Sequence, residues 1–418
     1  MFSRIGSAAY KKDLTNTKLL CEYLGNPQQK FKSIHVGGTN GKGSVSHMLS
    51  AVFQTANFKT GLYTSPHLYD FRERIKINGD MVPECFVVNF VEELKPLIEK
   101  VRPSFFEITV AMAFKYFAEQ QVDIAIVEVG LGGRLDSTNI IIPNLSIITN
   151  IGWDHMNMLG NTLEKIAFEK AGIIKENVPV VIGETTEETK KVFENTAREK
   201  HAEIYFAEET FKLQTFNWSG NELQVTYKTE LEETFVATDL PGIYQTKNIA
   251  TVLTAVEILN KGFDGLKKAV PSALLNTKNL TGLHGRWEII RTNPTVVLDV
   301  AHNTDGLQQM MMHIQTVEYS CLHIAFGIVK DKDIDRLLSV LPSEAIYYFS
   351  QANIPRALPA DELKLAAKAH KLNGDFFENV NTALKTALST ANPDDLIIVC
   401  GSIFLVAEVD RALVTQFS

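Results

Sequence analysis

The first half of the chain alternates short apolar runs with longer stretches in which apolar residues recur every three or four positions. The runs at residues 123–129, 145–151 and 178–183 are almost entirely apolar, as expected of parallel strands covered on both faces. Between the strands lie helical patterns, such as residues 105–120. This alternation predicts an α/β domain built on a mainly parallel sheet.

The pattern changes between residues 211 and 240. Two stretches there, residues 221–228 and 233–240, alternate polar and apolar positions with a period near two and are separated by polar residues. Such alternation predicts a small antiparallel meander attached to the first domain. The next stretch, residues 245–259, has the apolar spacing of a helix.

A second α/β unit is predicted from about Arg286 onward. Its expected strands are residues 295–303, 321–328, 344–350 and 395–404. The preceding stretch, residues 276–286, is polar and contains glycine, which suits a hinge between domains. We therefore expect a first domain at residues 1–280 and a Rossmann-like α/β domain at residues 286–418.

Length and composition fit this picture. A chain of 418 residues is too long for one ordinary core, and 45% hydrophobic with 22% charged residues is normal for a globular protein. The formal net charge of −8 makes nucleic acid and anionic lipid poor partners. The four cysteines are scattered without metal-site spacing, and neither a secretory signal nor an 18-residue apolar run is visible. We expect a cytoplasmic protein.

A glycine-rich loop at residues 37–44, "GGTNGKGS", lies between a predicted strand and a predicted helix. Glycines allow backbone amides to turn inward, and the helix N-terminus adds about half a positive charge. This context favours a phosphate cradle in which Lys42 reaches the terminal phosphates. The loop departs from the common P-loop pattern, because Val36 replaces a glycine and Gly43 precedes Ser44. The alternative is a glycine-rich turn with an exposed lysine.

Two polar residues follow consecutive apolar strands. Glu128 lies within an apolar run, where an unpaired carboxylate costs several kcal/mol, so it should bind a metal or form a salt bridge with a helix lysine. Asp154 and His155 leave the end of the next strand, where open α/β sheets place ligands. Glu128 and His155 could thus meet at one ion, although Mg²⁺ prefers oxygen ligands.

Two further residues have a plain structural interpretation beside a functional one. Lys170 lies near the end of a predicted helix at residues 162–175, where a surface lysine is the ordinary reading. Ser65 precedes Pro66 and could be a turn residue, or its hydroxyl could lie near the glycine-rich loop.

Seven motifs in this order and spacing resemble one family. They are "GGTNGKGS", "TSPHL", "EVGLGGRLDSTN", "WDHMNMLGNT", "EKAGIIK", "HGRWE" and "LDVAHN". Together they resemble the Mur-ligase superfamily, and within it the folylpolyglutamate synthase and dihydrofolate synthase branch. The resemblance extends from the first helix to "GSIFLVAEV" near residue 400. It implies a P-loop-type ATPase domain with a folate pocket, followed by a glutamate-ligase domain.

The resemblance also implies a reaction. In this family a substrate carboxylate attacks the γ-phosphate of ATP to give an acyl phosphate, and the amine of glutamate then displaces phosphate. Phosphorylation is needed because a carboxylate is a poor electrophile, and cations must hold the mutually repelling anions together. Implied cofactors are ATP and two Mg²⁺ ions.

Site residues follow from the matching positions. The ATP phosphates correspond to Thr39, Asn40, Gly41, Lys42, Gly43 and Ser44, and further nucleotide contacts to Asn248, Arg286 and Asp299. The metal ligands correspond to Ser65, Glu128, His155 and Lys170, of which Lys170 is carbamylated in this superfamily. His302 matches a further catalytic position. The pterin pocket corresponds to Ser104, Phe105, Phe106, Glu107, Leu135, Asp136 and Ser137, and Ser402 to the incoming glutamate.

The resemblance leaves the acceptor open between dihydropteroate and tetrahydrofolate. The stretch "KKDL", residues 11–14, lies where bifunctional bacterial members bind dihydropteroate, so we expect a monomeric enzyme that carries out both reactions. One alternative is another Mur-type ligase, although only about forty residues precede the glycine-rich loop. Others are a P-loop phosphotransferase or nucleotide switch, and a non-catalytic binding protein.

Overall fold

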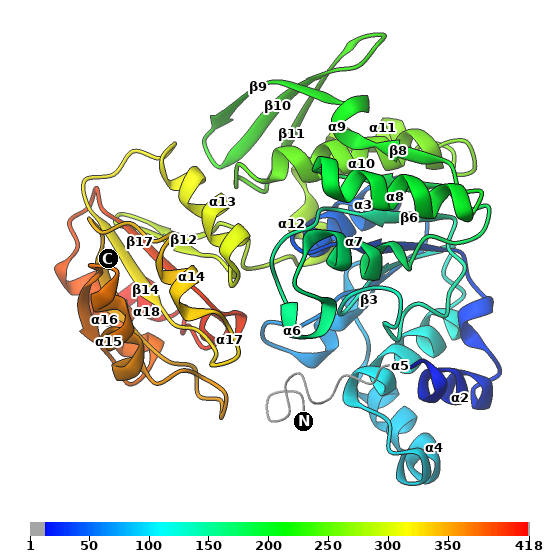
Figure 1. The fold of residues 1–418 in the computed structure, drawn as a ribbon, viewed down its shortest axis with the longest axis horizontal. Helices are drawn as coiled ribbons and strands as arrows, with labels where there is room; N and C mark the ends of the chain where they lie inside the picture. Colours follow the sequence, from blue (N-terminus) through cyan, green and yellow to red (C-terminus); the bar gives the residue numbers. More distant parts are fainter. Residues whose placement is uncertain (1–12, 417–418) are drawn as a thin grey trace. The chain divides into compact units, whose positions relative to one another are not determined.

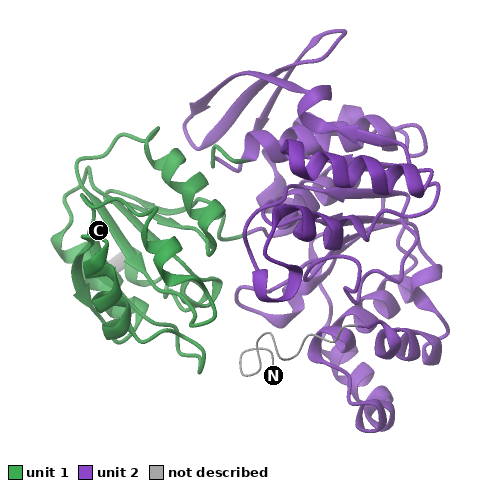
Figure 2. Cartoon of the chain, in the orientation of Figure 1, with its two compact units in different colours: residues 1–6, 242–244, 284–418 green, residues 7–241, 245–283 purple. Residues whose placement is uncertain are grey.

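The computed structural model of the protein describes residues 13–416, which form two compact units. Unit 2 contains residues 13–241 and 245–283, and unit 1 contains residues 242–244 and 284–416 (Figure 2). The stretch expected to be a hinge, residues 276–286, instead begins with helix α12 (Thr277–Thr281). Thr277 and Thr281 are buried, so this helix is part of the packed core of unit 2. The main chain therefore passes to unit 1 after Leu283.

Unit 2 is built on an eight-stranded sheet with the order β4-β3-β2-β5-β1-β6-β7-β8 (Figure 1). The strands are β1 (Ser33–Gly37), β2 (Thr60–Tyr63), β3 (Ile75–Ile77), β4 (Asp80–Met81), β5 (Ile124–Glu128), β6 (Leu145–Ile148), β7 (Val180–Ile182) and β8 (Ile204–Phe206). Pairing is parallel from β2 to β8, and only the β2–β3 and β3–β4 pairs are antiparallel. The predicted parallel α/β domain is confirmed.

Both faces of this sheet are covered. Ile124 and Ile126 of β5 join one apolar cluster, whereas Ala125 and Val127 join another. This two-sided burial explains why the strand sequences are apolar without alternation.

The helices of unit 2 besides α12 are α2 (Thr15–Tyr23), α3 (Lys42–Thr55), α4 (Glu84–Val101), α5 (Phe105–Glu119), α6 (Met156–Leu159), α7 (Leu163–Ala171), α8 (Glu187–Glu199), α9 (Ala207–Thr210), α10 (Gln245–Leu259) and α11 (Leu266–Leu275), with 3-10 turns η2 (Pro27–Gln29) and η3 (Phe71–Arg74).

The predicted meander is present as β9 (Lys212–Ser219), β10 (Glu222–Lys228) and β11 (Glu233–Thr238), a separate antiparallel sheet. Alternate residues of β10, namely Leu223, Val225 and Tyr227, are buried in the cluster that also contains residues of α10 and α11. Helix α10 has the bounds that the apolar spacing predicted. Helix α7 is shorter than predicted, because Gly172 caps it.

Unit 1 contains a six-stranded sheet with the order β12-β13-β17-β14-β15-β16. Its strands are β12 (Glu288–Thr292), β13 (Thr295–Leu298), β14 (Leu322–Phe326), β15 (Ile346–Phe349), β16 (Asn373–Phe376) and β17 (Leu396–Cys400), and its helices are α13 (Thr304–Ile314), α14 (Ile334–Leu338), α15 (Ala360–Ala369), α16 (Val380–Thr390), α17 (Ile403–Ala407) and α18 (Leu413–Gln416). Only β12 runs antiparallel to its neighbour. The second α/β domain is confirmed, with β12 and β16 as unpredicted edge strands.

Within residues 13–416, no helix combines the length and apolar character that crossing a membrane requires.

Candidate active site

The glycine-rich loop lies between β1 and α3, at the carboxyl ends of the parallel strands of unit 2. Helix α3 begins at Lys42 rather than at Val45, because Gly41 adopts a left-handed conformation (φ 82°) and acts as the N-cap. Gly43 and Ser44 therefore belong to the first helical turn. The N–H groups in the first turn of a helix have no carbonyl partner within the helix, so this end of α3 favours an anion.

The end of β6 fixes the shape of the loop. The backbone N–H of Thr39 donates to the Asn150 carbonyl oxygen at 3.0 Å, and the N–H of Asn40 donates to Asn150 Oδ1 at 2.8 Å. Thr149 Oγ1 donates to the carbonyl oxygen of Asn40. Asn150 and Thr149 were not among the predicted site residues, since nothing in "TNIG" marks them before the strands are assembled.

Helix α10 supports the other side of the loop. Gln245 Nε2 donates to Ser44 Oγ at 3.2 Å, and Asn248 Nδ2 donates to Gln245 Oε1 at 2.7 Å. A Cβ atom on Gly41 would lie 2.3 Å from Asn248 Oδ1, so the loop and α10 are in close contact here. The structure thus brings Asn248 to the loop, from more than 200 residues away in the sequence.

Two lysines converge on one carbonyl group of the loop. Lys42 Nζ donates to the carbonyl oxygens of Gly38 at 3.1 Å and Thr39 at 3.0 Å, and Lys170 Nζ donates to that of Gly38 at 2.7 Å. Lys170 is not a surface lysine, because only 4% of it is exposed. Burial, and then the charge of Lys42, lower its pKa to about 7, while Asp154 acts in the opposite direction.

Glu128 is the last residue of β5 and pairs with Val36 of β1, directly before the glycine-rich loop. It is 5% exposed, and its Oε2 accepts the backbone N–H of Ser65 at 3.0 Å. One nearby cation is Arg74, whose pKa is lowered by burial against the opposing effects of Tyr63 and Glu128. Arg74, from η3, therefore balances part of this carboxylate's charge.

His155 is the N-cap of α6 and has a left-handed backbone (φ 51°). Its side chain is 37% exposed, with Nε2 3.7 Å from Asp154 Oδ2. Among the described residues, no three His, Cys, Asp or Glu side chains are grouped to hold a metal ion. Any divalent ion near Glu128 and His155 would need ligands of other types, such as hydroxyls, phosphates or water.

The predicted pterin residues lie on α5 and on the turn after β5. Ser104 and Glu107 form a capping box, in which Ser104 Oγ accepts the N–H of Glu107 at 3.2 Å. The ring of Phe106 lies against Gly130, where a Cβ atom would be 2.3 Å from its Cζ. Phe105 instead packs on Phe71, with ring centroids 5.6 Å apart.

Asp136 organises the turn that carries the other predicted pterin residues. Its carboxylate accepts the N–H groups of Leu131 at 2.8 Å and Thr138 at 2.9 Å. Burial raises the pKa of Asp136. Its neighbours Leu135 and Ser137 are half-buried. Lys11 and Lys12 of the "KKDL" stretch lie outside the described residues.

In unit 1, Asp299 is the centre of a buried hydrogen-bond cluster. It accepts bonds from Tyr244 Oη at 2.8 Å and from the backbone N–H groups of Trp287 and Ala301, each at 2.9 Å. Arg286 lies near enough to oppose the rise that burial causes in the pKa of Asp299. The sequence did not predict Tyr244 as a site residue. Its contact with Asp299 forms only because residues 242–244 belong to unit 1.

The two remaining predicted residues have local contacts in unit 1. His302 Nδ1 lies 2.9 Å from the Val300 carbonyl oxygen. Ser402 is the N-cap of α17, and its Oγ accepts the N–H of Phe404 at 3.2 Å. Neither contact extends to the Asp299 cluster.

Both units match domains of known proteins. Residues 36–256 match the Mur ligase middle domain, and residues 285–403 match the Mur ligase glutamate ligase domain. A dihydrofolate synthase/folylpolyglutamate synthase of Bacillus subtilis is 34% identical over 423 residues, covering 96% of this chain and 95% of the relative.

Two solved structures are similar over nearly the full length. A folylpolyglutamate synthase of Mycobacterium tuberculosis, complexed with ADP and AMPPCP, has a TM-score of 0.87 and 30% identity, covering 97% of this chain and 96% of its own. FolC of E. coli, in complex with DHPP and ADP, has a TM-score of 0.86 and 28% identity, covering 100% and 97%. The chain belongs to the folylpolyglutamate synthase/dihydrofolate synthase family of the Mur ligase superfamily.

Proposed function

We propose that this protein is an ATP-dependent ligase that adds L-glutamate to the carboxylate of dihydropteroate and to the γ-carboxylate of tetrahydrofolate. The observation that carries this proposal is the similarity to a Bacillus subtilis enzyme of that name across 96% of the chain. The chemistry has two steps. A carboxylate oxygen attacks the γ-phosphorus of ATP and ADP leaves. The glutamate amine then attacks the acyl carbon, loses a proton and expels inorganic phosphate.

The glycine-rich loop is the proposed site for the ATP phosphates. Thr39, Asn40 and Gly41 shape the loop, and Lys42, Gly43 and Ser44 form the first turn of α3. The positive end of the helix and the Lys42 ammonium would balance charge that develops on the transferring phosphoryl group. Asn248 would complete the site from α10.

Replacing Gly41 with alanine is expected to raise the KM for ATP about tenfold or more. The new Cβ would lie 2.3 Å from Asn248 Oδ1, and the left-handed backbone would be strained by about 1–3 kcal/mol. Steady-state kinetics checks this result. Gly220→Ala is the matched control, since Gly220 is also left-handed but has nothing within 4 Å of its Cβ position. An unchanged KM in Gly41→Ala would remove the loop from nucleotide binding.

Mg²⁺ is the proposed metal, with Ser65, Glu128, His155 and Lys170 as candidate ligands. Glu128 fits best, since it is a buried carboxylate beside the glycine-rich loop. A small set of protein ligands suits Mg²⁺, which keeps several waters and binds substrate phosphates. When bound, the ion would neutralise phosphate charge. Ser65 lies near this position through its backbone bond to Glu128.

Lys170 is the proposed site of carbamylation. Its buried amine has a pKa lowered to about 7, so a large fraction is neutral and nucleophilic near neutral pH. Addition of CO₂ to this nitrogen, with loss of a proton, gives an anionic carbamate. That group would be a metal ligand where an ammonium could not be one.

Wild-type protein incubated in ¹³C-bicarbonate is expected to show one carbamate carbon by NMR that Lys170→Met lacks. Lys175→Met is the control, since Lys175 is also partly buried but bonds to Asn139 O instead of the loop. Retention of the signal in Lys170→Met would assign the carbamate to another amine, and no signal in wild type would reject the modification.

The unit 1 residues have proposed roles on the strength of the family resemblance. Arg286 and Asp299 would contact the nucleotide, His302 would act in catalysis, and Ser402 would hold the incoming glutamate. The hydrogen bonds that fix Asp299 support a rigid role for its carboxylate. For Ser402, its capping bond to Phe404 offers a structural role as well.

The proposed acceptors are dihydropteroate and tetrahydrofolate. Ser104, Phe105, Phe106 and Glu107 on α5, with Leu135, Asp136 and Ser137 on the neighbouring turn, are the proposed pterin residues. Mass spectrometry after incubation with ATP, glutamate and either dihydropteroate or tetrahydrofolate tests this proposal. Both acceptors should gain one glutamyl residue. A gain with tetrahydrofolate alone would reject bifunctionality, and a gain with neither would reject the ligase.

A further inference from the structure

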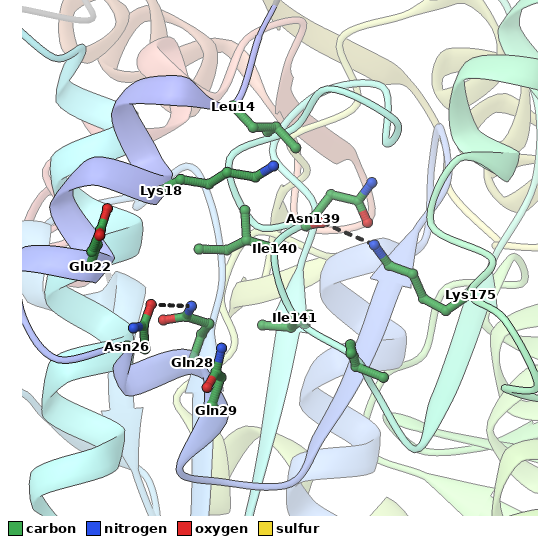
Figure 3. Close-up of a pocket in the computed structure, with 11 residues that line it drawn as sticks. Leu14, Lys18, Glu22, Asn26, Gln28, Gln29, Asn139, Ile140, Ile141 and Lys175 are labelled. Atoms are coloured by element: carbon green, nitrogen blue, oxygen red, sulfur yellow. Dashed lines mark hydrogen bonds between the residues drawn. The ribbon is translucent and has the colours of Figure 1, made fainter.

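A pocket lies in unit 2, and none of the residues proposed to bind ATP, the metal or the pterin ring lines it. Its volume is about 550 Å³, enough for a small ligand. Helix α2 and turn η2 form one side, and residues 139–142 with Lys175 form the other (Figure 3). Leu14, the last residue of the "KKDL" stretch, is among the lining residues.

Two lysines face this pocket. Lys18 follows Leu14 by one turn of α2, and its amine is directed toward Ile140 and Asn139 (Figure 3). Lys175 lies across Asn139 from Lys18, and its Nζ donates to the Asn139 carbonyl oxygen at 3.0 Å (Figure 3). No acidic side chain among residues 13–416 forms an ion pair with either lysine, although Glu22 lines the same pocket.

The pKa of Lys175 is consistent with a positive electrostatic potential around its amine. Burial, and then the charges of Lys200 and Lys18, lower its pKa to about 8. No acidic group is among the causes of this shift. A bound anion would relieve the repulsion between the lysines, which no ion pair within residues 13–416 offsets.

The remaining walls suit a small polar molecule. Asn26, Gln28 and Gln29 offer amide donors and acceptors, with Gln28 Nε2 donating to Asn26 Oδ1 at 3.3 Å. Gln28 Oε1 is buried without a hydrogen-bond partner. Ile140 and Ile141 add an apolar wall. Such a mixture of a few convergent polar groups and apolar surface is typical of ligand pockets.

We propose that this pocket binds a small anion, a carboxylate or a phosphate, between Lys18 and Lys175. The site is additional to the proposed ligase chemistry. Its occupancy would be transmitted to the predicted substrate turn through Asn139. The backbone N–H of Asn139 donates to the Asp136 carbonyl oxygen at 2.8 Å, and its Nδ2 donates to that of Arg134 at 3.0 Å.

Competitive acylation of lysines, read by mass spectrometry on the full chain without ATP, tests the site. The probes are inorganic phosphate and L-glutamate, each compared with sodium chloride at equal ionic strength. Either probe, at concentrations up to about 20 mM, is expected to reduce acylation of Lys175 several-fold in a saturable manner. Acylation of Lys100, an exposed lysine in the last turn of α4, should not change.

The variant Lys18→Gln gives the sharper comparison, since Lys18 is exposed and its replacement should not disturb the fold. It should weaken protection of Lys175 about tenfold, whereas Lys100→Gln should leave it unchanged. Protection by phosphate alone, by glutamate alone or by both identifies the source of the anion. No protection by either probe, or equal protection in Lys18→Gln, would overturn the proposal. Because no turnover is measured, this outcome is independent of the ligase activity.

Discussion

Lys42→Ala is expected to lower kcat by roughly 10³-fold while the protein remains folded. Lys42 begins α3, and its ammonium bonds to the carbonyl oxygens of Gly38 and Thr39. This position would allow it to turn to a phosphate and to balance charge that grows during phosphoryl transfer. Alanine keeps the helix but removes that charge.

The stability cost of Lys42→Ala should be on the order of 2 kcal/mol, as for the loss of a charged hydrogen-bond donor. Thermal unfolding of the variant and steady-state kinetics separate the two effects. Lys212→Ala is the control, because Lys212 is an exposed lysine of β9 in the same unit. Turnover within about threefold of wild type in Lys42→Ala would refute the role of the lysine.

Glu128→Gln is expected to reduce kcat by about 10²–10³-fold. Much of the activity should remain lost at every Mg²⁺ concentration tested. Glutamine preserves the shape of the side chain, and its carbonyl oxygen can still accept the Ser65 N–H. The negative charge that would attract the ion is lost. Removal of this charge also leaves buried Arg74 less compensated, so a modest loss of stability is expected.

Asp123→Asn provides the matched control for Glu128→Gln. Asp123 directly precedes the other end of β5, is exposed, and accepts the Lys59 N–H at 2.7 Å, which asparagine can also accept. Its activity and Mg²⁺ dependence should equal those of wild type. If Glu128→Gln behaves in the same way, Glu128 is not a metal ligand.

The sequence predicted the strands that are buried on both faces and missed those at sheet edges. Strand β16 reads "NGDF" and is mostly exposed, so it lacks the apolar run by which a strand is recognised. Strand β12 contains Glu288 and Arg291 and pairs antiparallel to its neighbour. The formation of such edge strands depends more on pairing with the neighbouring strand than on the strand propensity of their own residues.

Candidate site residues could be chosen from the sequence, whereas the residues that contact them could not. Glu128 was singled out as a carboxylate within an apolar run, and the glycine-rich loop by its position between a strand and a helix. The neighbours Arg74, Asn150 and Gln245 come from other elements, and no local pattern distinguishes them from ordinary polar residues. Lys170 shows the limit most clearly, since its burial and contact with Gly38 depend on how α7 packs.

Transfer of ¹⁸O from substrate to phosphate tests the central claim most directly. Dihydropteroate labelled with ¹⁸O in its carboxylate is incubated with the protein, ATP and glutamate, and the released phosphate is analysed by mass spectrometry. An acyl phosphate predicts one ¹⁸O atom in each phosphate formed with a ligated product. Glutamyl product accompanied by unlabelled phosphate would contradict carboxylate activation by phosphoryl transfer.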